Sequence, residues 1–473
     1  MFNNSSETSI FFWAIVWLGA IVLVMTRFSK KESAGTGLVL AYLINLWLIH
    51  WPGAVAYLSS SSTAVDLDPV EVGFRISSYG VVAFVIGSLV FGPFIAGALK
   101  RRANVVASSI SMMQASKAYI IIGILFYISI GSFLAFIPSV RSLLSSGWQL
   151  VVVGICIALW FAWQRRDSRR LWIILLMSLT LPLITLVTQG FVSFGVAALI
   201  AICAFTAIFY RPRVKLVLVG LLVGYIAFSF YIGYMKERET IRDAVWGGQD
   251  YSVRLERMKA LFTSFEFFNP LDPDHLKDVD QRLNQNILVG ASVSYLSNGF
   301  ENYASGETLV EAVEALIPRA FWPDKPLGGG SGDLVSRYTG ISFGVNTSVG
   351  IGQVLEFYIN FGVIGVIIGF LFLGTIIGVV DQMAMYNLAG GSWRGFTLWY
   401  LPGLALLQAG GQLVEITAGA AAALTIASLV TWALFLYYRV PMQRQSAGGK
   451  IVPKSKPSLN LPSTNNTLES RSD

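Results

Sequence analysis

The sequence predicts an all-α polytopic membrane protein with one large polar insertion, and three observations lead to that prediction. Of 473 residues, 54% are hydrophobic and 13% are charged, whereas soluble domains carry about 25% charged residues. Apolar runs of about 17 to 25 residues, the length that crosses the hydrocarbon core, recur along most of the chain. A single long polar segment, residues 236–347, interrupts these runs.

The apolar runs predict about eleven transmembrane helices, within a range of about ten to twelve. The fifth run is short, and only the turn Thr188-Gln189-Gly190 separates the sixth run from the seventh. The runs lie approximately at residues 9–26, 36–58, 73–97, 118–137, 148–163, 171–188, 190–210, 214–235, 361–380, 395–411 and 413–438.

These runs divide the chain into four parts. Residues 1–235 are expected to form an N-terminal transmembrane bundle of about eight helices, and residues 348–438 to add about three more. Between them lies the polar segment, residues 236–347. Residues 439–473 are rich in Gln, Ser, Gly, Lys, Pro and Asn, a composition that predicts a disordered tail.

Basic residues predict the orientation of the bundle. With the N-terminus placed outside, the cytoplasmic connections and tail carry 21 Lys and Arg residues, and the short connections on the other side carry 2. Because positive charge favours the cytoplasmic side, the N-terminus and residues 236–347 are expected to be extracytoplasmic and the C-terminus cytoplasmic. The first apolar run lacks a basic leader and a cleavage site, so it is expected to be a retained span.

Composition also argues against several classes of function. The net charge of +7 comes from short connections, so it reflects orientation and predicts no nucleic-acid partner. Cys156 and Cys203 both lie in apolar runs, so neither a redox pair nor a metal site is expected. Four aspartates of the polar segment lack the glycine of a calcium loop and are expected to be solvated. They are Asp272, Asp274, Asp278 and Asp280.

The polar segment is expected to be partly helical. Helices are predicted after Asp250, at about 281–296, and from Glu307 to Ile317, where Pro318 ends the helix. His50 is expected to pack within an apolar run, and His275 lies in a polar turn without a second histidine.

A proline-rich string closes the polar segment. It runs from Ile317 to Gly330 and reads IPRAFWPDKPLGGG, and its prolines restrict the backbone to extended conformations. This rigidity fits a binding surface, and it fits equally an ion pair between Arg319 and Asp324 that only holds the loop in place. The three glycines lack the Lys-Ser/Thr that would follow them in a phosphate-binding loop.

One carboxylate is predicted to lie close to the membrane boundary. Residues 346–360, NTSVGIGQVLEFYIN, are too polar for a free span, yet they continue into the ninth apolar run. An ionised carboxylate at the centre of a membrane helix costs about 2.5–3.5 kcal/mol, so Glu356 needs a partner. That partner is either an arginine of the polar segment or an acceptor hydroxyl, which Glu356 would orient or deprotonate.

In its span pattern and two motifs, IPRAFWPDKP and VLEFYINFGVIG, the chain resembles the Wzy-type O-antigen and exopolysaccharide repeat-unit polymerases. The motifs cover residues 316–366. The resemblance implies a GT-C-like architecture in a bacterial inner membrane and glycosyl transfer on the outer face without a cofactor. Donor and acceptor would be undecaprenyl-pyrophosphate-linked glycans, and membrane lipid, a flippase and a chain-length regulator are further expected partners.

Site residues follow from these motifs and from the chemistry of glycosyl transfer. Arg319 is expected to stabilise the pyrophosphate leaving group, and Glu356 is the expected base. These two are the predicted catalytic residues, and no metal is expected. The predicted substrate-binding residues are Arg238, Trp322, Asp324, Lys325, Arg337 and Tyr358. Phe361 and Gly362 complete the second motif.

The chain departs from the pattern at two places. O-antigen ligases resemble the polymerases but use a histidine of the large loop, in a pattern that His275 does not reproduce. The short turn before the seventh span often carries an arginine in these families, and here it reads Thr188-Gln189-Gly190.

Three other functions stay open. Another multispanning polyprenyl-phosphate glycosyltransferase would use Asp66 and Asp68 of the first outer loop. A polysaccharide transporter or flippase is disfavoured by the scarcity of charges within the apolar runs and the absence of an internal repeat. A scaffold subunit would use the proline-rich string only as a docking surface.

Overall fold

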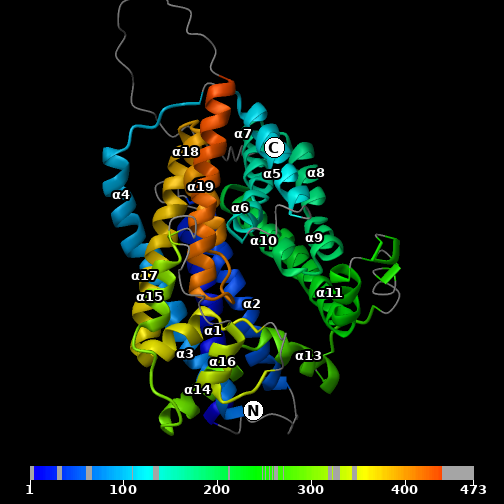
Figure 1. Cartoon of the computed structure of the whole chain (residues 1–473), viewed down its shortest axis with the longest axis vertical. Helices are drawn as coiled ribbons and strands as arrows, with labels where there is room; N and C mark the ends of the chain where they lie inside the picture. Colours follow the sequence, from blue (N-terminus) through cyan, green and yellow to red (C-terminus); the bar gives the residue numbers. More distant parts are fainter. Residues whose placement is uncertain are drawn as a thin grey trace, which may run out of the picture.

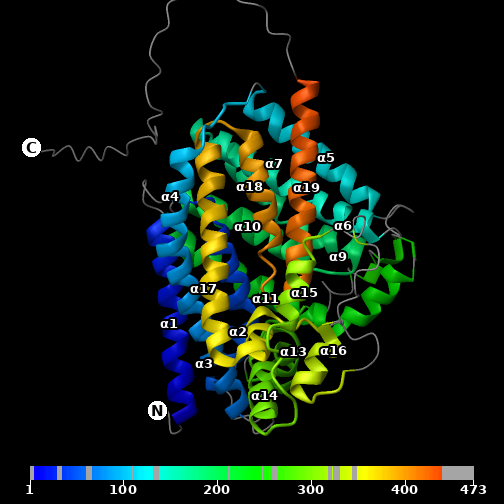
Figure 2. The ribbon, with the colours of Figure 1, turned by 60° about the vertical axis from the view of Figure 1, so that its left-hand side comes forward.

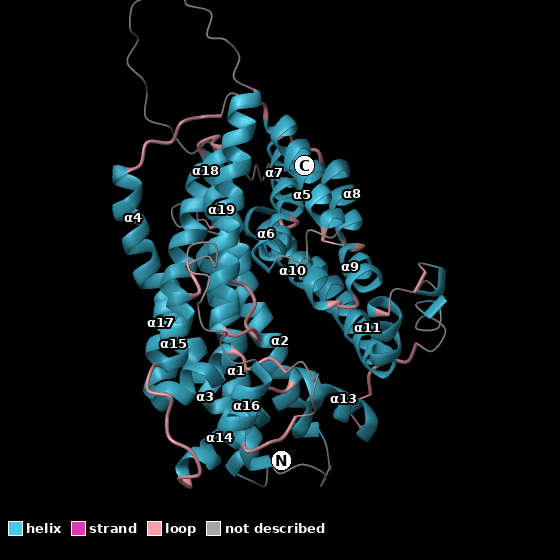
Figure 3. Ribbon diagram, in the orientation of Figure 1, coloured by secondary structure: helices cyan, strands magenta, loops and turns pink. Residues whose placement is uncertain are grey.

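The structure is a computed structural model of the 473-residue chain. It describes residues 5–28, 35–59, 67–108, 110–130, 138–210, 214–247, 249–250, 252–254, 256–257, 259, 265–269, 271–317, 322, 331–343 and 349–438. All regular structure within these ranges is helical, and they contain no strand (Figure 3).

The helices form two groups and an end layer (Figure 1). The first group contains α1 (Ser5–Phe28), α2 (Leu38–Ser59), α3 (Leu67–Ile86), the π-helical turn η2 (Gly87–Phe91), α4 (Gly92–Arg102), α17 (Gln353–Ala389), α18 (Trp393–Ala405) and α19 (Leu413–Tyr437). The second contains α5 (Met112–Ser129), α6 (Pro138–Gly147), α7 (Leu150–Gln164), α8 (Ser168–Ser178), α9 (Leu181–Gln189), α10 (Ser193–Tyr210) and α11 (Val214–Trp246).

The end layer is built from the polar segment. It contains α13 (Pro273–Leu283), α14 (Asn286–Ser297), α15 (Glu307–Glu314) and α16 (Ser331–Thr339). Helices α13, α14 and α16 lie at the end of the bundle where α1 begins, and α15 packs against α17 and α19 (Figures 1 and 2).

The described part of the chain has 9 helices that are long and apolar enough to cross a membrane. The protein is therefore a multi-pass helical membrane protein, and nine of the predicted runs coincide with these helices. The predicted run 395–411 is not confirmed, because α18 has only 13 residues and so spans about 20 Å of a hydrocarbon core of about 30 Å. The run 214–235 lies in α11, which continues to Trp246 and is not among the 9.

A kink divides α17 at the second motif. Phe361 (φ −142°, ψ 25°) and Gly362 (φ 61°, ψ −149°) leave the helical conformation, and the Gly362 conformation is open essentially only to glycine. A short buried segment, residues 353–360, therefore precedes the long part of α17, residues 363–389. The predicted ninth span, 361–380, begins at this kink and is longer than expected.

Small residues bring α17 against the helix formed by α3, η2 and α4. A Cβ atom added at Gly374 would lie 2.3 Å from the carbonyl oxygen of Phe84, and one at Gly87 would lie 2.2 Å from that of Leu371. Membrane helices associate through such close backbone approach, since lipid supplies no hydrophobic driving force between them.

Replacing Gly374 by alanine is expected to lower the free energy of unfolding by about 1–3 kcal/mol, because the added methyl group overlaps backbone atoms that cannot yield cheaply. Thermal unfolding of the purified protein measures the change. Gly97→Ala is the matched control: nothing lies within 4 Å of a Cβ at Gly97, so the same substitution should leave stability unchanged or slightly higher. Equal melting temperatures for the two variants would contradict the packing described.

The predicted helix at 281–296 is interrupted, because its middle residues hydrogen bond to α2. The Gln285 N–H donates to the carbonyl of Ile49 at 3.0 Å, and Asn286 Nδ2 donates to the carbonyl of His50 at 2.7 Å. The ring Nδ1 of His50 lies 2.8 Å from Asn286 Oδ1. His50 is thus fully buried, as predicted, and it fastens the end layer to the bundle.

The rest of the polar segment matches the predictions in part. The predicted helix 307–317 is α15, which ends three residues earlier at Glu314. Most of the amphipathic stretch after Asp250, including Leu255, Met258 and Phe262, lies outside the described residues. Helix α16, which follows the three glycines, was not predicted.

The two ends of the bundle differ in charge. The Ser108 N–H donates to the carbonyl of Gly391 at 3.0 Å, and Trp393 Nε1 donates to that of Ile110 at 3.0 Å. These bonds join the α4–α5 connection to the α17–α18 turn, so the basic end of α4 and Arg394 share one end of the bundle. The polar layer occupies the other end (Figure 2).

Candidate functional site

Glu356, the predicted base, caps the first turn of α19. Its Oε2 accepts a hydrogen bond from the N–H of Leu413 at 2.7 Å. The N-cap residue of α19, Gln412, makes no capping side-chain bond, so Glu356 satisfies a donor that a helix start leaves open. Among the described residues the partner is a helix N-terminus, and none of their arginines pairs with Glu356. Glu356 has 0% exposure. Its Oε1 makes no hydrogen bond of ordinary length among the described residues, and the Thr308 hydroxyl is close enough to act on the carboxyl as a donor.

Asn360 ties the Glu356 segment to α15. Its Nδ2 donates to Thr308 Oγ1 at 2.7 Å and to the carbonyl of Glu356 at 2.7 Å, and its Oδ1 accepts from the N–H of Gly306 at 2.9 Å. Residue Thr308 belongs to α15, which leads directly into the proline-rich string. The network therefore joins the segment of the predicted base to the start of α15, the helix that precedes the proline-rich string.

Two more predicted residues gather around this network. Tyr358 is buried, and its ring centroid lies 6.3 Å from that of Tyr303. Arg337 of α16 lies 3.6 Å from a carboxylate oxygen of Glu301 and 3.9 Å from one of Glu307. Its side chain is 49% exposed, so it faces solvent at the edge of the site with carboxylate partners of its own.

Of the site residues predicted in the proline-rich string, only Trp322 is among the described residues. Arg319, Asp324 and Lys325 lie outside the described residues, as does Asp66. Trp322 is half-buried. Asp68, at the start of α3, is exposed and accepts a hydrogen bond from Ser6 at 3.3 Å.

Arg238 lies apart from the Glu356 network, on α11. This helix packs against α9 and α13, and residues 236–239 continue it where a loop was expected. One turn further along, Arg242 is 9% exposed, and its guanidinium lies 4.8 Å from the ring centroid of Phe191. Phe191 directly follows the turn that lacks the expected arginine. Arg242 was not predicted as a site residue, because the apolar run ends near residue 235; its i, i+4 spacing from Arg238 is the signal in the sequence.

A cavity of about 270 Å³ lies between the two helix groups. Its walls come from α2, α7, α10 and the segment between α18 and α19. Side chains of Asn45, Gln149 and Gln408 supply polar atoms, and no charged residue contributes to the lining. The same segment carries Gly410, a wall residue whose carbonyl accepts the Gly352 N–H at 3.2 Å. Leu413, which donates to Glu356, therefore lies two positions after Gly411, a residue of the cavity wall.

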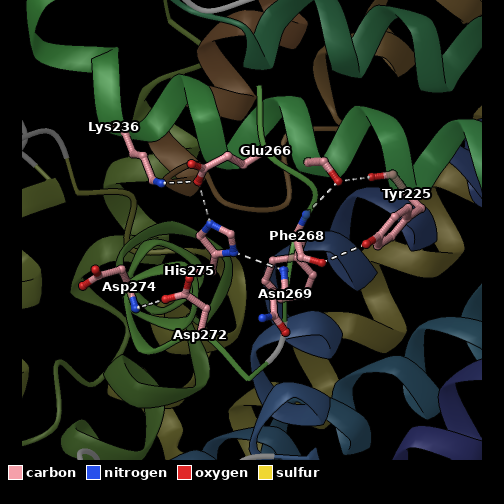
Figure 4. A network of polar contacts seen from close by, with 9 residues as sticks. Tyr225, Lys236, Glu266, Phe268, Asn269, Asp272, Asp274 and His275 are labelled. Carbon is pink, nitrogen blue, oxygen red and sulfur yellow. Dashed lines mark hydrogen bonds and ion pairs between the residues drawn. The ribbon is translucent and has the colours of Figure 1, made fainter. Parts of the chain in front are cut away.

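A second polar network joins α11 to α13 (Figure 4). Lys236 Nζ lies 3.0 Å from Glu266 Oε2, and His275 Nε2 lies 3.5 Å from the same oxygen. The other ring nitrogen of His275 accepts the N–H of Asn269 at 3.0 Å. His275 is 3% exposed, so this histidine, predicted in a polar turn, is a buried link between two elements.

Acidification is expected to loosen this link. Lys236 first, and then His275, hold the pKa of Glu266 below its usual value of 4.5. A carboxylate with a lowered folded-state pKa contributes stability at pH values above 4.5, and the contribution is lost as pH falls through the lowered value. The hydrogen-exchange protection factors of residues 265–276, which correct for the pH dependence of intrinsic exchange, should therefore fall below about pH 4. In Glu266→Gln the exchange should already be faster at neutral pH, and an unchanged rate in that variant would contradict the role assigned to Glu266.

The acidic residues of α13 serve the fold. Asp272 Oδ1 caps α13 by accepting the Asp274 N–H at 2.9 Å, and Asp280 Oδ2 accepts the hydroxyl of Tyr57 at 2.6 Å. Among the residues that the structure describes, no group of three or more His, Cys, Asp or Glu side chains could hold a metal ion.

Comparison with known proteins gives one family and no individual relative. No curated protein and no solved structure matches the chain. The profile of one family matches residues 73–412, a stretch that includes the polar layer and Glu356. The chain therefore belongs to the family described as Domain of unknown function (DUF8712).

Proposed function

We propose that this chain is a glycosyltransferase that polymerises oligosaccharide repeat units on the outer face of a bacterial inner membrane. A glycan carried on undecaprenyl pyrophosphate is transferred to the end of a second lipid-linked repeat unit. The acceptor oxygen forms a bond to the anomeric carbon while the bond from that carbon to the pyrophosphate breaks. The proton of the acceptor hydroxyl passes to Glu356, and undecaprenyl pyrophosphate leaves.

The position of Glu356 carries this proposal. Its carboxyl contacts the N-terminus of α19, next to the segment that walls the cavity, and its backbone is joined through Asn360 to α15 of the end layer. One oxygen accepts the Leu413 N–H, and the Thr308 hydroxyl lies close to the carboxyl as a second donor. Because Glu356 has 0% exposure, an acceptor hydroxyl reaches Oε1 only when α15 or a neighbouring segment moves aside.

The charge distribution supports the proposed orientation. Basic residues of α4 and of the α17–α18 turn lie at the end opposite to the polar layer. By the positive-inside rule that end faces the cytoplasm, and the polar layer then meets the lipid-linked glycan on the outer face. Arg319 is proposed to stabilise the pyrophosphate, supported by Lys325, and Trp322 and Tyr358 to stack on sugar rings.

Deleting the gene is the test of the proposal. Lipid-linked glycans should collapse from long polymer to single repeat units on the outer leaflet, and a plasmid copy should restore polymer. Single repeats retained on the inner leaflet would indicate a flippase instead, and long polymer persisting after deletion would overturn the proposal. The alternative transferase predicts that Asp66→Asn with Asp68→Asn, and not Glu356→Gln, removes the polymer.

A further inference from the structure

Two arginines project from the part of α11 that extends beyond its apolar stretch. Arg238 and Arg242 are four residues apart, so they lie on one face of the helix. Arg242 is buried beside Ile241 and Val245, and its guanidinium lies against the ring of Phe191 at 4.8 Å. A positive charge is thereby held in apolar surroundings next to the α9–α10 turn.

The electrostatics of this face favour an anion. Burial first, and then the positive charge of Arg238, lower the pKa of Arg242. The acidic neighbours Glu239 and Asp243 oppose this shift only in part: each follows an arginine by one position, on another side of the helix, and both are exposed. Two guanidinium groups on one face can hold several phosphate oxygens at once through their fixed fork of N–H donors.

The same turn connects the arginine face to the cavity. The ring centroids of Phe191 and Phe194 are 5.7 Å apart, and Phe194 lines the cavity of about 270 Å³. Phe191 thus contacts Arg242 on one side and a cavity wall on the other. Since the cavity is lined by apolar and uncharged polar side chains, it suits a neutral group and not an anion.

We propose that Arg238 and Arg242 bind the phosphate or pyrophosphate group of an amphiphile whose neutral part occupies the cavity. The inference rests on the proposed function, in which undecaprenyl pyrophosphate carries the glycan, and it adds Arg242 and the cavity to the residues assigned there. An anionic phospholipid offers the same chemistry from a different source.

Binding to the purified full-length protein in nanodiscs tests this site without requiring polymerisation. The probe is undecaprenyl pyrophosphate, titrated into phosphatidylcholine nanodiscs and followed by native mass spectrometry. Arg242→Gln and Arg238→Gln should each weaken binding about tenfold or more, the loss expected for a charge-assisted hydrogen bond. Arg257→Gln is the matched control, because Arg257 is an exposed arginine of the same polar segment, and it should bind as the wild type does.

Arg238→Gln and one further variant, Arg242→Lys, separate an effect on binding from an effect on folding. Arg238 is only half-buried, so Arg238→Gln should keep the wild-type melting temperature even if Arg242→Gln does not. Arg242→Lys retains the charge without the fork of donors and should show an intermediate affinity. Wild-type affinity in both Arg238→Gln and Arg242→Gln would overturn the proposal.

A separate variant tests whether the cavity binds the neutral part of the amphiphile. Ala197→Phe narrows the cavity, which Ala197 lines, and should weaken undecaprenyl pyrophosphate while leaving inorganic pyrophosphate binding unchanged. Equal affinity of the variant and the wild type for the long-chain probe would overturn the assignment of the cavity.

A competition experiment between undecaprenyl pyrophosphate and an anionic phospholipid identifies which amphiphile is the ligand. Phosphatidylglycerol in the nanodisc should not displace undecaprenyl pyrophosphate if the lipid-linked carrier is the ligand. Displacement at equal concentration would support the anion site but assign it to bulk lipid, which contradicts its link to the proposed function. Because polymer length is not measured, failure here is distinguishable from failure of the polymerase proposal.

Discussion

Glu356→Gln is expected to abolish polymer and leave lipid-linked glycans as single repeat units. The amide oxygen of glutamine can still accept the Leu413 N–H, so the cap on α19 survives, but the side chain can no longer take a proton from an acceptor hydroxyl. Losing the charge at the helix N-terminus costs about 0.3–1 kcal/mol, which is too little to unfold the protein. Gel analysis of glycans from a deletion strain that carries the variant provides the measurement.

Two companion variants separate catalysis from capping. Glu356→Ala removes the acceptor as well as the base, so it should also destabilise the protein by about 1–3 kcal/mol, the cost of an unsatisfied buried donor. Glu314→Gln, on neighbouring α15, removes a carboxylate that makes no such contact and should leave polymer length unchanged. Wild-type polymer made by Glu356→Gln would show that the carboxylate has a structural role only.

Asp381→Ala is expected to cause the largest loss of stability in the bundle. Asp381 has 0% exposure, and its Oδ1 accepts the N–H of Thr36 at 2.7 Å and that of Leu38 at 3.0 Å. It therefore caps the start of α2 from the C-terminal part of α17. Without this side chain two buried N–H donors have no acceptor, which costs about 1–3 kcal/mol for each donor. The free energy of unfolding should therefore fall by about 2–6 kcal/mol.

Asp381→Asn is the matched control for this prediction, since its amide oxygen can keep both backbone bonds. Thermal unfolding should place its melting temperature close to that of the wild type and well above that of Asp381→Ala. If the melting temperature of Asp381→Ala equals that of the wild type, the contact with α2 contributes nothing to stability.

Glu356 and Asp381 show which contacts of buried carboxylates could not be predicted from the sequence. The energetic cost of a buried carboxylate indicated correctly that Glu356 needs a partner, and an arginine of the polar segment or an acceptor hydroxyl was considered. The partner found among the described residues is the N-terminus of α19, which lies 57 positions further along the chain. Asp381 escaped notice because the apolar run ended at residue 380, whereas α17 continues to Ala389.

The helical class and most of the spans could be predicted from the length of the apolar runs. In lipid, each such segment must satisfy its backbone hydrogen bonds internally, which a helix does. The predicted run 395–411 did not end with α18, although residues 406–412, LLQAGGQ, are less apolar than a span. These residues leave the helix, and the carbonyls of Gly410 and Ala409 accept the N–H groups of Gly352 and Gln353. Arg242 was missed for the opposite reason: α11 keeps its helical conformation into a polar sequence. Tertiary contacts decided both outcomes.

Reconstitution tests the central claim most directly. The purified full-length chain in proteoliposomes should convert single undecaprenyl-pyrophosphate-linked repeat units into a ladder of longer glycans and release undecaprenyl pyrophosphate, and Glu356→Gln protein should leave the single repeats unchanged. A wild-type preparation, folded and supplied with the cognate lipid-linked repeat unit, that yields no ladder would contradict the account.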